Sequence, residues 1–278
     1  MRPFFVIGAQ RSGTTVLSRL IAGHPDVFLT VNGKLLYYLI AWVYRSGEAH
    51  PGMHLRLDEI IHSLDRKPML GVPPEAIETM KRTLATAFPP ERFADASAAE
   101  VVRTIWNETY AAAAGGCSVV GDKYNEYLLQ LRDIRAIHPG ARILFIHRNP
   151  YDAAESMIRA FRGRPWAPLT PELALAKWAD WNAQWLEVRE AIDPADRIEL
   201  AYEDLVADPV AAFSAICGFL GVPVASDYLR FVDASIDRGV PASRSSDWVR
   251  GHASRDPETF AAVASALGYA QAVAEVGR

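Results

Sequence analysis

The sequence predicts an α/β protein in which a mainly parallel central sheet is flanked by helices. Short apolar runs of β-forming residues alternate along the chain with longer stretches of helical periodicity. This alternation is typical of right-handed βαβ units, which build parallel sheets. The apolar runs also lack a regular polar alternation, as expected of strands covered on both faces. We therefore expect a three-layer sandwich with the sheet in the middle.

Four apolar runs are expected to form the core strands, at residues 4–8, 118–122, 143–147 and 198–201. Eight helices are expected, at residues 14–22, 73–88, 98–114, 128–137, 150–161, 171–192, 209–220 and 257–267. Several of them have proline in the first turn, where its missing N–H costs no hydrogen bond. Residues 47–52 and 162–170 are expected to be loops that border a pocket.

The bulk composition favours one soluble domain over residues 1–278 and excludes several classes of partner. A net charge of -4, from 29 basic and 33 acidic residues, gives no overall field that attracts nucleic acid or an acidic membrane. Cys117 and Cys217 form no C-x-x-C pair, which fits a reducing compartment. The longest apolar run, residues 35–44, falls well short of the roughly 20 residues of a membrane span. With no export signal visible, we expect a cytoplasmic protein.

The first candidate site is the glycine-containing segment from Gly8 to Thr15, which follows an apolar strand and precedes a helix. In this context the backbone N–H groups and the positive helix end can hold a phosphate. The segment departs from the P-loop pattern G-x-x-x-x-G-K-[ST], because Thr14 stands at the lysine position and the cation is Arg11. The missing lysine counts against γ-phosphoryl transfer. The alternative is an ordinary strand-turn-helix corner.

A second candidate element lies at residues 143–156, where a strand ends in Arg148 and a helix begins at Pro150. The guanidinium can bind a phosphate through two hydrogen bonds, and Ser156 on the helix can approach the same anion. In open α/β sheets, ligands bind beyond the carboxyl ends of the strands, where both elements are expected. Taken alone, however, this element would more simply be a surface ion pair and an exposed serine.

With these elements in view, the chain resembles the sulfotransferases that use 3'-phosphoadenosine 5'-phosphosulfate, especially the bacterial branch and the related tyrosylprotein enzymes. Four blocks carry the resemblance, in the family's order: residues 11–15 with 24–27, residues 121–123, residues 142–156, and residues 202–205 with 219–223. Weaker matches follow at residues 243–250 and 267–269. The resemblance implies a P-loop-type fold, in which residues 34–117 are a helical insertion on the acceptor side and no separate domain.

The resemblance also implies roles for individual residues. Those implied for the donor's 5'-phosphosulfate are Gln10, Arg11, Ser12, Gly13, Thr14 and Thr15. Arg148 and Ser156 would hold its 3'-phosphate, and Tyr202 would contact the nucleoside, although Glu203 and Asp204 beside it could equally be structural. Arg244 or Arg250 would fold over the 3'-phosphate, with a solvated surface loop as the alternative. Lys123 would point at the transferring group and act with Arg11 in catalysis.

Sulfuryl transfer resembles phosphoryl transfer, so we expect catalysis by positioning and positive charge, with no metal required. The general base that an acceptor needs is not identified. The position of the glutamate in tyrosylprotein-type enzymes corresponds to residues near 31–34, which contain no glutamate. The histidine of cytosolic enzymes is replaced by Asn125. The remaining candidates are weak: Asp122, Glu126, Glu59, His50, His54 and His62.

Two groups of residues have both a structural and a functional interpretation. His50 and His54 have the spacing of a metal pair, but the intervening Pro51 and Gly52 favour a plain loop. The tryptophans at 178, 181 and 185 recur at helical spacing, which favours a core stripe over an acceptor pocket. The aromatic residues at 37, 38, 42 and 44 are better placed to touch an acceptor.

The acceptor is expected to be a small molecule or a glycan, of a class that the sequence does not identify, and a homodimer is left open. Two other functions compete with sulfuryl transfer. A P-loop kinase or triphosphatase would use the same loop, but it is disfavoured by the missing lysine. A non-catalytic nucleotide-binding relative would explain the missing base. Metal-free binding of 3',5'-phosphoadenosine would argue against the kinase, whereas donor binding without any sulfated product would indicate the non-catalytic relative.

Overall fold

The structure is a computed structural model, and it describes residues 2–46, 53–66, 69, 72–236 and 247–274. The strands found in these ranges are β1 (Phe4–Ile7), β2 (Val27–Val31), β3 (Val119–Lys123), β4 (Arg142–His147) and β5 (Arg197–Ala201). They form one parallel sheet in the order β2-β3-β1-β4-β5. The non-consecutive order requires crossover connections, and the helices between the strands provide them. The predicted α/β class is confirmed.

The predicted strands agree with the structure in place, with two corrections. The sequence predicts no strand at β2, yet all five of its residues are buried, including Thr30. The hydroxyl of Thr30 is satisfied by the carboxylate of Asp122, a partner that only the fold supplies. β5 is half-exposed along its length, whereas a buried strand is predicted there. The reason is its position, because β5 is the last strand in the sheet order.

The helices are α1 (Thr14–Ala22), α2 (Leu35–Leu39), α3 (Met53–Arg66), α4 (Pro74–Thr86), α5 (Ala98–Ala113), α6 (Leu131–Ile137), α7 (Pro150–Phe161), α8 (Pro171–Val188), α9 (Tyr202–Ala207), α10 (Pro209–Leu220), α11 (Ser226–Ser235), α12 (Asp247–Arg250), α13 (Pro257–Ala266) and α14 (Ala270–Ala274). α1, α7 and α10 match the predicted bounds, and α4, α5 and α13 match them within two residues. The predicted helix at 128–137 is wrong in its first part, where a 3₁₀ helix covers Asn125–Gln130. The helix predicted at 171–192 stops at Val188 and continues as a short 3₁₀ turn.

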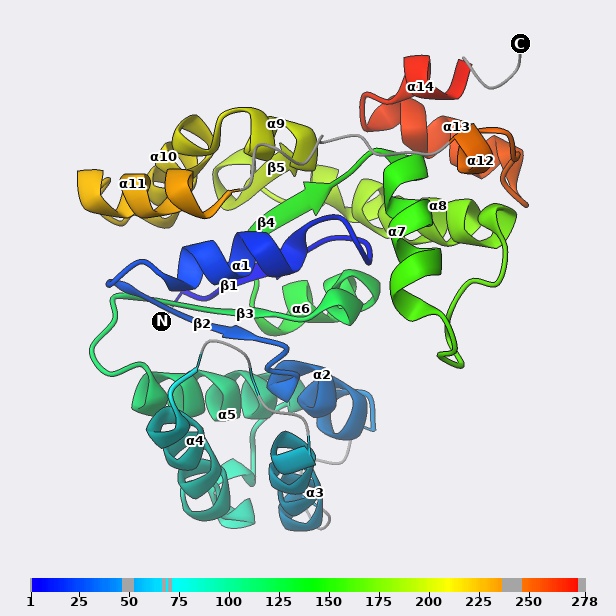
Figure 1. Cartoon of the computed structure of the whole chain (residues 1–278). Helices are drawn as coiled ribbons and strands as arrows, with labels where there is room; N and C mark the ends of the chain where they lie inside the picture. The colour runs from blue at the N-terminus through cyan, green and yellow to red at the C-terminus, as the bar shows by residue number, and fades with distance from the viewer. Residues whose placement is uncertain (1, 47–52, 67–68, 70–71, 237–246, 275–278) are drawn as a thin grey trace. The chain divides into compact units, whose positions relative to one another are not determined.

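The chain forms two compact units, the first made of residues 1–6 and 17–143 and the second of residues 7–16 and 144–278. In the first unit, α4 packs against both α3 and α5 (Figure 1). Its core includes Phe5, whose ring centroid lies 5.5 Å from that of Trp106 and 5.7 Å from that of Tyr127. Phe5 lies on β1, which pairs with β3, and β3 ends in Lys123.

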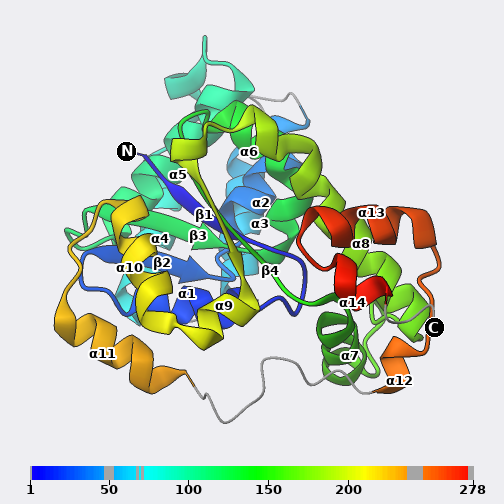
Figure 2. The same cartoon turned by 90° about the horizontal axis from the view of Figure 1, so that it is seen from above.

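In the second unit, α8 packs against α7 and α13, and these helices lie together in Figures 1 and 2. Trp178 and Trp185 on α8 are fully buried, and the Trp185 ring stacks on Phe145 of β4 with centroids 4.7 Å apart. The core interpretation of these two tryptophans is confirmed, while Trp181 is only half-buried. Among the residues that the structure describes, no helix combines the length and the apolar character that a membrane span requires.

Candidate functional site

The loop from Gly8 to Thr15 makes a tight turn between β1 and α1 in the second unit. Arg11 and Gly13 both lie in the left-handed region of backbone conformation, with φ of 69° and 94°. A Cβ on Gly8 would lie 2.3 Å from the carbonyl oxygen of Ile146, so the loop begins in close contact with β4. Strained backbone of this kind is typical of functional turns. The predicted strand-loop-helix context of this segment is therefore present.

Polar atoms of this loop have the properties of an anion site. Ser12 is fully buried, and its hydroxyl oxygen has no hydrogen-bond partner among the described residues, like the side-chain oxygen of Gln10. Thr14 is the first residue of α1, and the N–H groups of a first helical turn have no partner within the helix. Buried polar atoms without protein partners favour a polar ligand. The residues of the loop therefore fit a phosphate or sulfate group.

The side chains of Arg11 and Ser156 meet although they are distant in sequence. The Nε of Arg11 donates a hydrogen bond to the Ser156 hydroxyl over 3.0 Å. Partial burial lowers the pKa of Arg11, and the charge of Arg148 lowers it further. The structure thus brings the two predicted arginines close enough for their charges to repel each other. An anion bound between them would relieve that repulsion.

Tyr202 connects the loop to Arg148. The Arg148 guanidinium carbon lies 4.5 Å from the centroid of the Tyr202 ring, within the range of a cation–π contact. On the loop side, a Cβ added to Gly13 would lie 2.4 Å from Cδ2 of Tyr202. The ring therefore packs directly against the glycine. Both predicted phosphate elements and Tyr202 come together in the second unit.

The backbone around Arg148 is held by local capping and by two side chains. Asn149 caps α7 by accepting a hydrogen bond from the Tyr151 N–H over 3.0 Å, and Pro150 is the first helical residue. Trp178 Nε1 donates to the Arg148 carbonyl oxygen over 3.0 Å. Glu203 accepts a hydrogen bond from the Asn149 N–H over 2.9 Å. Glu203 therefore has a structural contact, whereas Asp204 beside it is exposed.

Arg250 and Arg244, the two arginines predicted to fold over the 3'-phosphate, have different outcomes. Arg250 ends α12, a helix that packs against α7, and its charge acts on the phenol of Tyr151, whose pKa is raised by burial. It thus lies near the start of the helix that carries Ser156. Arg244 lies outside the described residues, as do the predicted loop at 47–52 and His50.

Lys123 ends β3 in the first unit, and its side chain is only 2% exposed. Its Nζ donates a hydrogen bond to Asn125 Oδ1 over 2.7 Å. In the sheet, Lys123 is in register with Val6, two residues before Gly8 in the chain. Sequence reasoning considered Asn125 only as the replacement of a histidine. Residues two apart at a strand end point to the same side, and this spacing could have identified Asn125 as a partner of Lys123.

Asp122, next to Lys123, sits in a buried network of hydroxyl groups. Thr30 Oγ1 donates to its Oδ1 over 2.5 Å, and Tyr127 Oη donates to its Oδ2 over 2.5 Å. Tyr110 Oη lies 2.8 Å from Thr30 Oγ1. Burial raises the pKa of Asp122, against the hydrogen bonds that lower it. Because Asp122 is fully buried and accepts hydrogen bonds on both oxygens, its contacts favour a structural role.

The other base candidates differ in exposure. Glu59 and His62 are exposed on α3, and Glu126 is half-buried in the 3₁₀ helix after β3. The negative charge of Glu126 adds to burial in raising the pKa of the Tyr124 phenol, so the two side chains are close. The side chain of His54 lies outside the described residues. None of these observations singles out one residue as the base.

Half-buried aromatic side chains gather on α2, the π-helix after it (Ile40–Tyr44) and the segment after β3. Tyr38 stacks on Trp42 with ring centroids 4.7 Å apart, and Tyr37 contacts the edge of Tyr124 at 5.2 Å. Lys34 Nζ lies 5.0 Å from the centroid of the Tyr124 ring. Tyr124 follows Lys123 directly in the chain. Three of the four aromatic residues predicted for the acceptor thus form a cluster with Tyr124, while Tyr44 is half-buried nearby in sequence.

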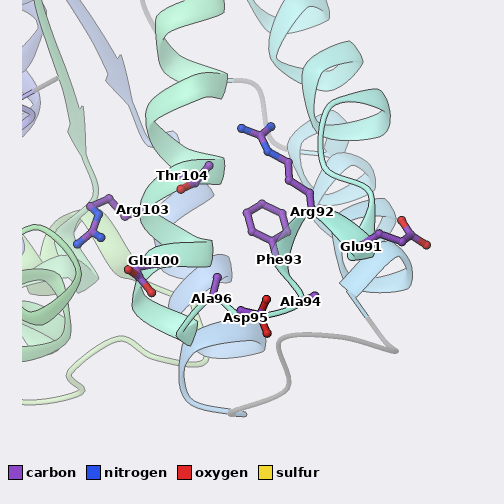
Figure 3. A pocket seen from close by; sticks show the side chains of 9 residues that line it. All are labelled: Glu91, Arg92, Phe93, Ala94, Asp95, Ala96, Glu100, Arg103 and Thr104. Carbon is purple, nitrogen blue, oxygen red and sulfur yellow. The ribbon is translucent and has the colours of Figure 1, made fainter.

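A separate hollow of about 500 Å³ in the first unit is lined by charged residues before and on α5 (Figure 3). Two of its charged side chains have structural partners. Arg92 pairs with Glu108 over 2.5 Å, and the Glu100 carboxylate accepts the Ser97 N–H over 2.9 Å in a capping box. The contacts of Arg92 and Glu100 in this hollow are therefore structural.

A family model described as the Sulfotransferase family matches residues 3–227. The chain belongs to the sulfotransferase family. The matched region includes the loop Gly8–Thr15, Lys123, Arg148, Ser156 and Tyr202, and it ends before α12, α13 and α14. The family resemblance inferred from the four sequence blocks is thus confirmed.

One curated protein is similar to part of this chain. Nodulation protein NoeE of Sinorhizobium fredii (strain NBRC 101917 / NGR234) is 27% identical over 157 residues, which are 55% of this chain and 30% of that protein. The chain thus matches less than a third of the length of this curated relative.

Solved sulfotransferase structures show the same fold. The sulfotransferase domain of the Synechococcus PCC 7002 olefin synthase has a TM-score of 0.58 and 23% identity, with 100% of this chain and 95% of that chain covered. The sulfotransferase domain of the curacin biosynthetic pathway has a TM-score of 0.64 and 19% identity, with 97% and 98% covered. Mouse sulfotransferase SULT7A1, solved in complex with PAP, has a TM-score of 0.50 and 16% identity, with 98% and 88% covered.

Proposed function

We propose that the chain transfers a sulfuryl group from 3'-phosphoadenosine 5'-phosphosulfate to a hydroxyl or amine of a small-molecule or glycan acceptor. The observation that carries this proposal is the convergence of Arg11, Arg148, Ser156 and Tyr202 at one loop. Two cations beside buried, unpartnered loop oxygens suit a ligand with more than one anionic group. The presence of PAP in the structure of the related mouse enzyme supports a donor of this class.

The donor would be held along the loop and the β4–α7 turn. Residues 10–15 would bind the 5'-phosphosulfate through backbone N–H groups, the Ser12 hydroxyl and the Arg11 guanidinium. Arg148 and Ser156 would bind the 3'-phosphate, Tyr202 would contact the nucleoside, and Arg250 and Arg244 would contribute charge from the carboxyl-terminal side. The donor would supply an activated sulfuryl group from its mixed phosphate–sulfate anhydride, with 3',5'-phosphoadenosine as the leaving group.

The catalytic contribution of the chain would be positive charge and positioning. Arg11 and Lys123 would stabilise the negative charge that develops on the leaving phosphate oxygen. Asn125 accepts a hydrogen bond from Lys123 and so orients its ammonium group. An amide is not a base at neutral pH, so Asn125 cannot take the role of the histidine that relatives carry there. We propose that the chain uses no metal for this chemistry.

The aromatic cluster of Tyr37, Tyr38, Trp42 and Tyr124 would contact the acceptor. Its members contact one another in the first unit, and Tyr124 is bonded to the residue proposed to face the transferring group. Half-buried tyrosine and tryptophan side chains offer both an apolar face and a polar end to a ligand. Truncating Trp42 or Tyr38 to alanine should therefore weaken acceptor binding, and an unchanged acceptor affinity would oppose this role.

The decisive experiment is calorimetric titration of the full chain with adenosine 3',5'-bisphosphate, 5'-AMP and Mg-ATP. The titrations with the bisphosphate and with 5'-AMP are repeated in EDTA. We expect the bisphosphate to bind most tightly, and its affinity to be the same in EDTA. Arg148→Ala should weaken the binding of the bisphosphate by on the order of 10- to 100-fold and leave the binding of 5'-AMP nearly unaffected. Tight binding and hydrolysis of Mg-ATP, with no preference for the bisphosphate, would instead indicate a P-loop kinase or triphosphatase.

A further inference from the structure

A chain of hydrogen bonds in the second unit links both sequence neighbours of Arg148 to one carboxylate. Tyr269 Oη donates to Glu203 Oε2 over 2.9 Å, and His147 Nδ1 lies 2.9 Å from the same hydroxyl. The other oxygen of Glu203 accepts the Asn149 N–H over 2.9 Å. The residue before Arg148 and the residue after it are thus both connected to Glu203.

The direction in which each of these hydrogen bonds is donated follows from the chemistry of the three side chains. A carboxylate can only accept hydrogen bonds, and a phenol has a single proton, which Tyr269 donates to Glu203. His147 must therefore donate from Nδ1 to the Tyr269 oxygen. The His147 side chain is only 8% exposed, and burial lowers its pKa to about 4. The imidazole is thus neutral near pH 7, with its proton on Nδ1.

The same turn of helix also supports the side chain of Arg148. Glu203 follows Tyr202 in the first turn of α9, and the Tyr202 ring lies against the Arg148 guanidinium. On the other side, the indole of Trp178 donates to the Arg148 carbonyl oxygen and lies 6.2 Å from the Tyr269 ring. Arg148 is thus held at its main chain by Trp178 of α8 and at its side chain by Tyr202 of α9.

We propose that Tyr269 and Glu203 are positioning residues, which hold Arg148 in the orientation that binds the 3'-phosphate of the donor. This inference rests on the proposed function. Tyr269 lies between α13 and α14, outside residues 3–227 that match the family model. The donor site therefore extends to the carboxyl-terminal segment, where Tyr269 contributes a phenolic hydroxyl that acts through Glu203 and His147.

The test is Tyr269→Phe in the full chain, which removes the hydroxyl and keeps the ring that packs on His147 and Trp178. Calorimetry with adenosine 3',5'-bisphosphate and with 5'-AMP separates an effect at the 3'-phosphate from a general one. We expect the bisphosphate to bind roughly three- to tenfold more weakly and 5'-AMP to bind as in the wild type. The ring nitrogens of His147 provide a second readout, since ¹⁵N NMR should show Nδ1–H in the wild type and a shifted tautomer balance in the variant.

Three variants make the result specific. Tyr228→Phe, at a buried tyrosine on α11, is the matched control and should bind both nucleotides normally. Glu203→Gln removes the same charge-assisted contact from the other end and should reproduce the effect even if Tyr269→Phe folds poorly. In an Arg148→Ala background, Tyr269→Phe should cause no further loss, because it acts through Arg148.

Equal weakening of both nucleotides, or a full further loss in the Arg148→Ala background, would overturn the positioning role. Wild-type binding of the bisphosphate by Tyr269→Phe and Glu203→Gln would overturn it as well, while leaving the proposed function intact. If the wild type itself does not prefer the bisphosphate over 5'-AMP, the proposed function fails, and the positioning role fails with it.

Discussion

The Nε of Arg11 donates a hydrogen bond to the hydroxyl of Ser156, 145 positions along the chain. This contact joins the loop after β1 to the helix after β4, and Arg148 lies at the start of that helix. The two elements predicted separately as anion sites are therefore parts of one cluster of cations and hydroxyls. The proximity of Arg148 to the loop is what allows one nucleotide to contact both elements.

Ser156→Ala should weaken the binding of adenosine 3',5'-bisphosphate by roughly three- to tenfold, because it removes one hydrogen bond that orients Arg11. Isothermal titration calorimetry measures this change. Ser214→Ala is the control, since its hydroxyl donates only to the Val210 carbonyl oxygen on the exposed side of α10. Wild-type affinity in Ser156→Ala would show that the contact does not matter for binding.

Lys123→Met should lower kcat on the order of 10²–10³-fold, or ~2.7–4 kcal/mol, if the ammonium stabilises charge in the transition state. Turnover is measured with any acceptor that the wild type sulfates. Lys81→Met on α4 is the control, because Lys81 makes a surface ion pair with Glu78. A kcat equal to the wild type would remove Lys123 from the catalytic group.

Gly13→Ala should reduce both stability and donor binding. A positive φ costs a non-glycine residue about 1 kcal/mol or more, and here the new Cβ would also displace the Tyr202 ring. Gly116→Ala is a matched control, because its φ of 92° is almost that of Gly13 and no atom lies within 4 Å of the added Cβ. Urea unfolding should show a similar loss of stability from backbone strain in both variants, with a further loss only in Gly13→Ala. Calorimetry should show weaker bisphosphate binding only in Gly13→Ala. Normal bisphosphate affinity in Gly13→Ala would contradict the predicted contact.

The stability of the protein should fall as the pH drops from about 6.5 toward 3, because buried His138 must gain a proton. Burial lowers the pKa of His138 to about 3, and its side chain is 3% exposed. Since the folded state resists protonation and the unfolded state does not, the stabilising effect is complete above pH 6.5 and is lost on acidification.

His138→Gln should remove about 1.4 kcal/mol per pH unit from the pH dependence of the unfolding free energy in this range. Comparing the slopes of the variant and the wild type cancels the contributions of other groups, including His147 and Asp122. Parallel slopes for His138→Gln and the wild type would contradict the predicted burial effect.

The predictable parts of the fold are those coded by local patterns. The run Phe4–Ile7, the glycine turn and the periodic helix Thr14–Ala22 lie next to one another in the chain, so one window of sequence contains the whole element. The same holds for β4, Asn149 and α7, where the cap and Pro150 mark the helix start. β2 could not be predicted in this way, because the burial of Thr30 depends on Asp122, which comes from a distant strand.

The α/β class and membership in the sulfotransferase family follow from short patterns of apolar, glycine and charged residues. The same patterns predict the loop Gly8–Thr15 and Arg148 as candidate anion sites. The contacts between distant residues appear in the folded structure alone: Arg11 contacts Ser156, Asn125 holds Lys123, and Tyr269 and Glu203 hold the neighbours of Arg148. Directional hydrogen bonds between residues far apart in the chain depend on ångström-scale placement of side chains. That placement is set by packing of the whole core, and no local pattern encodes it.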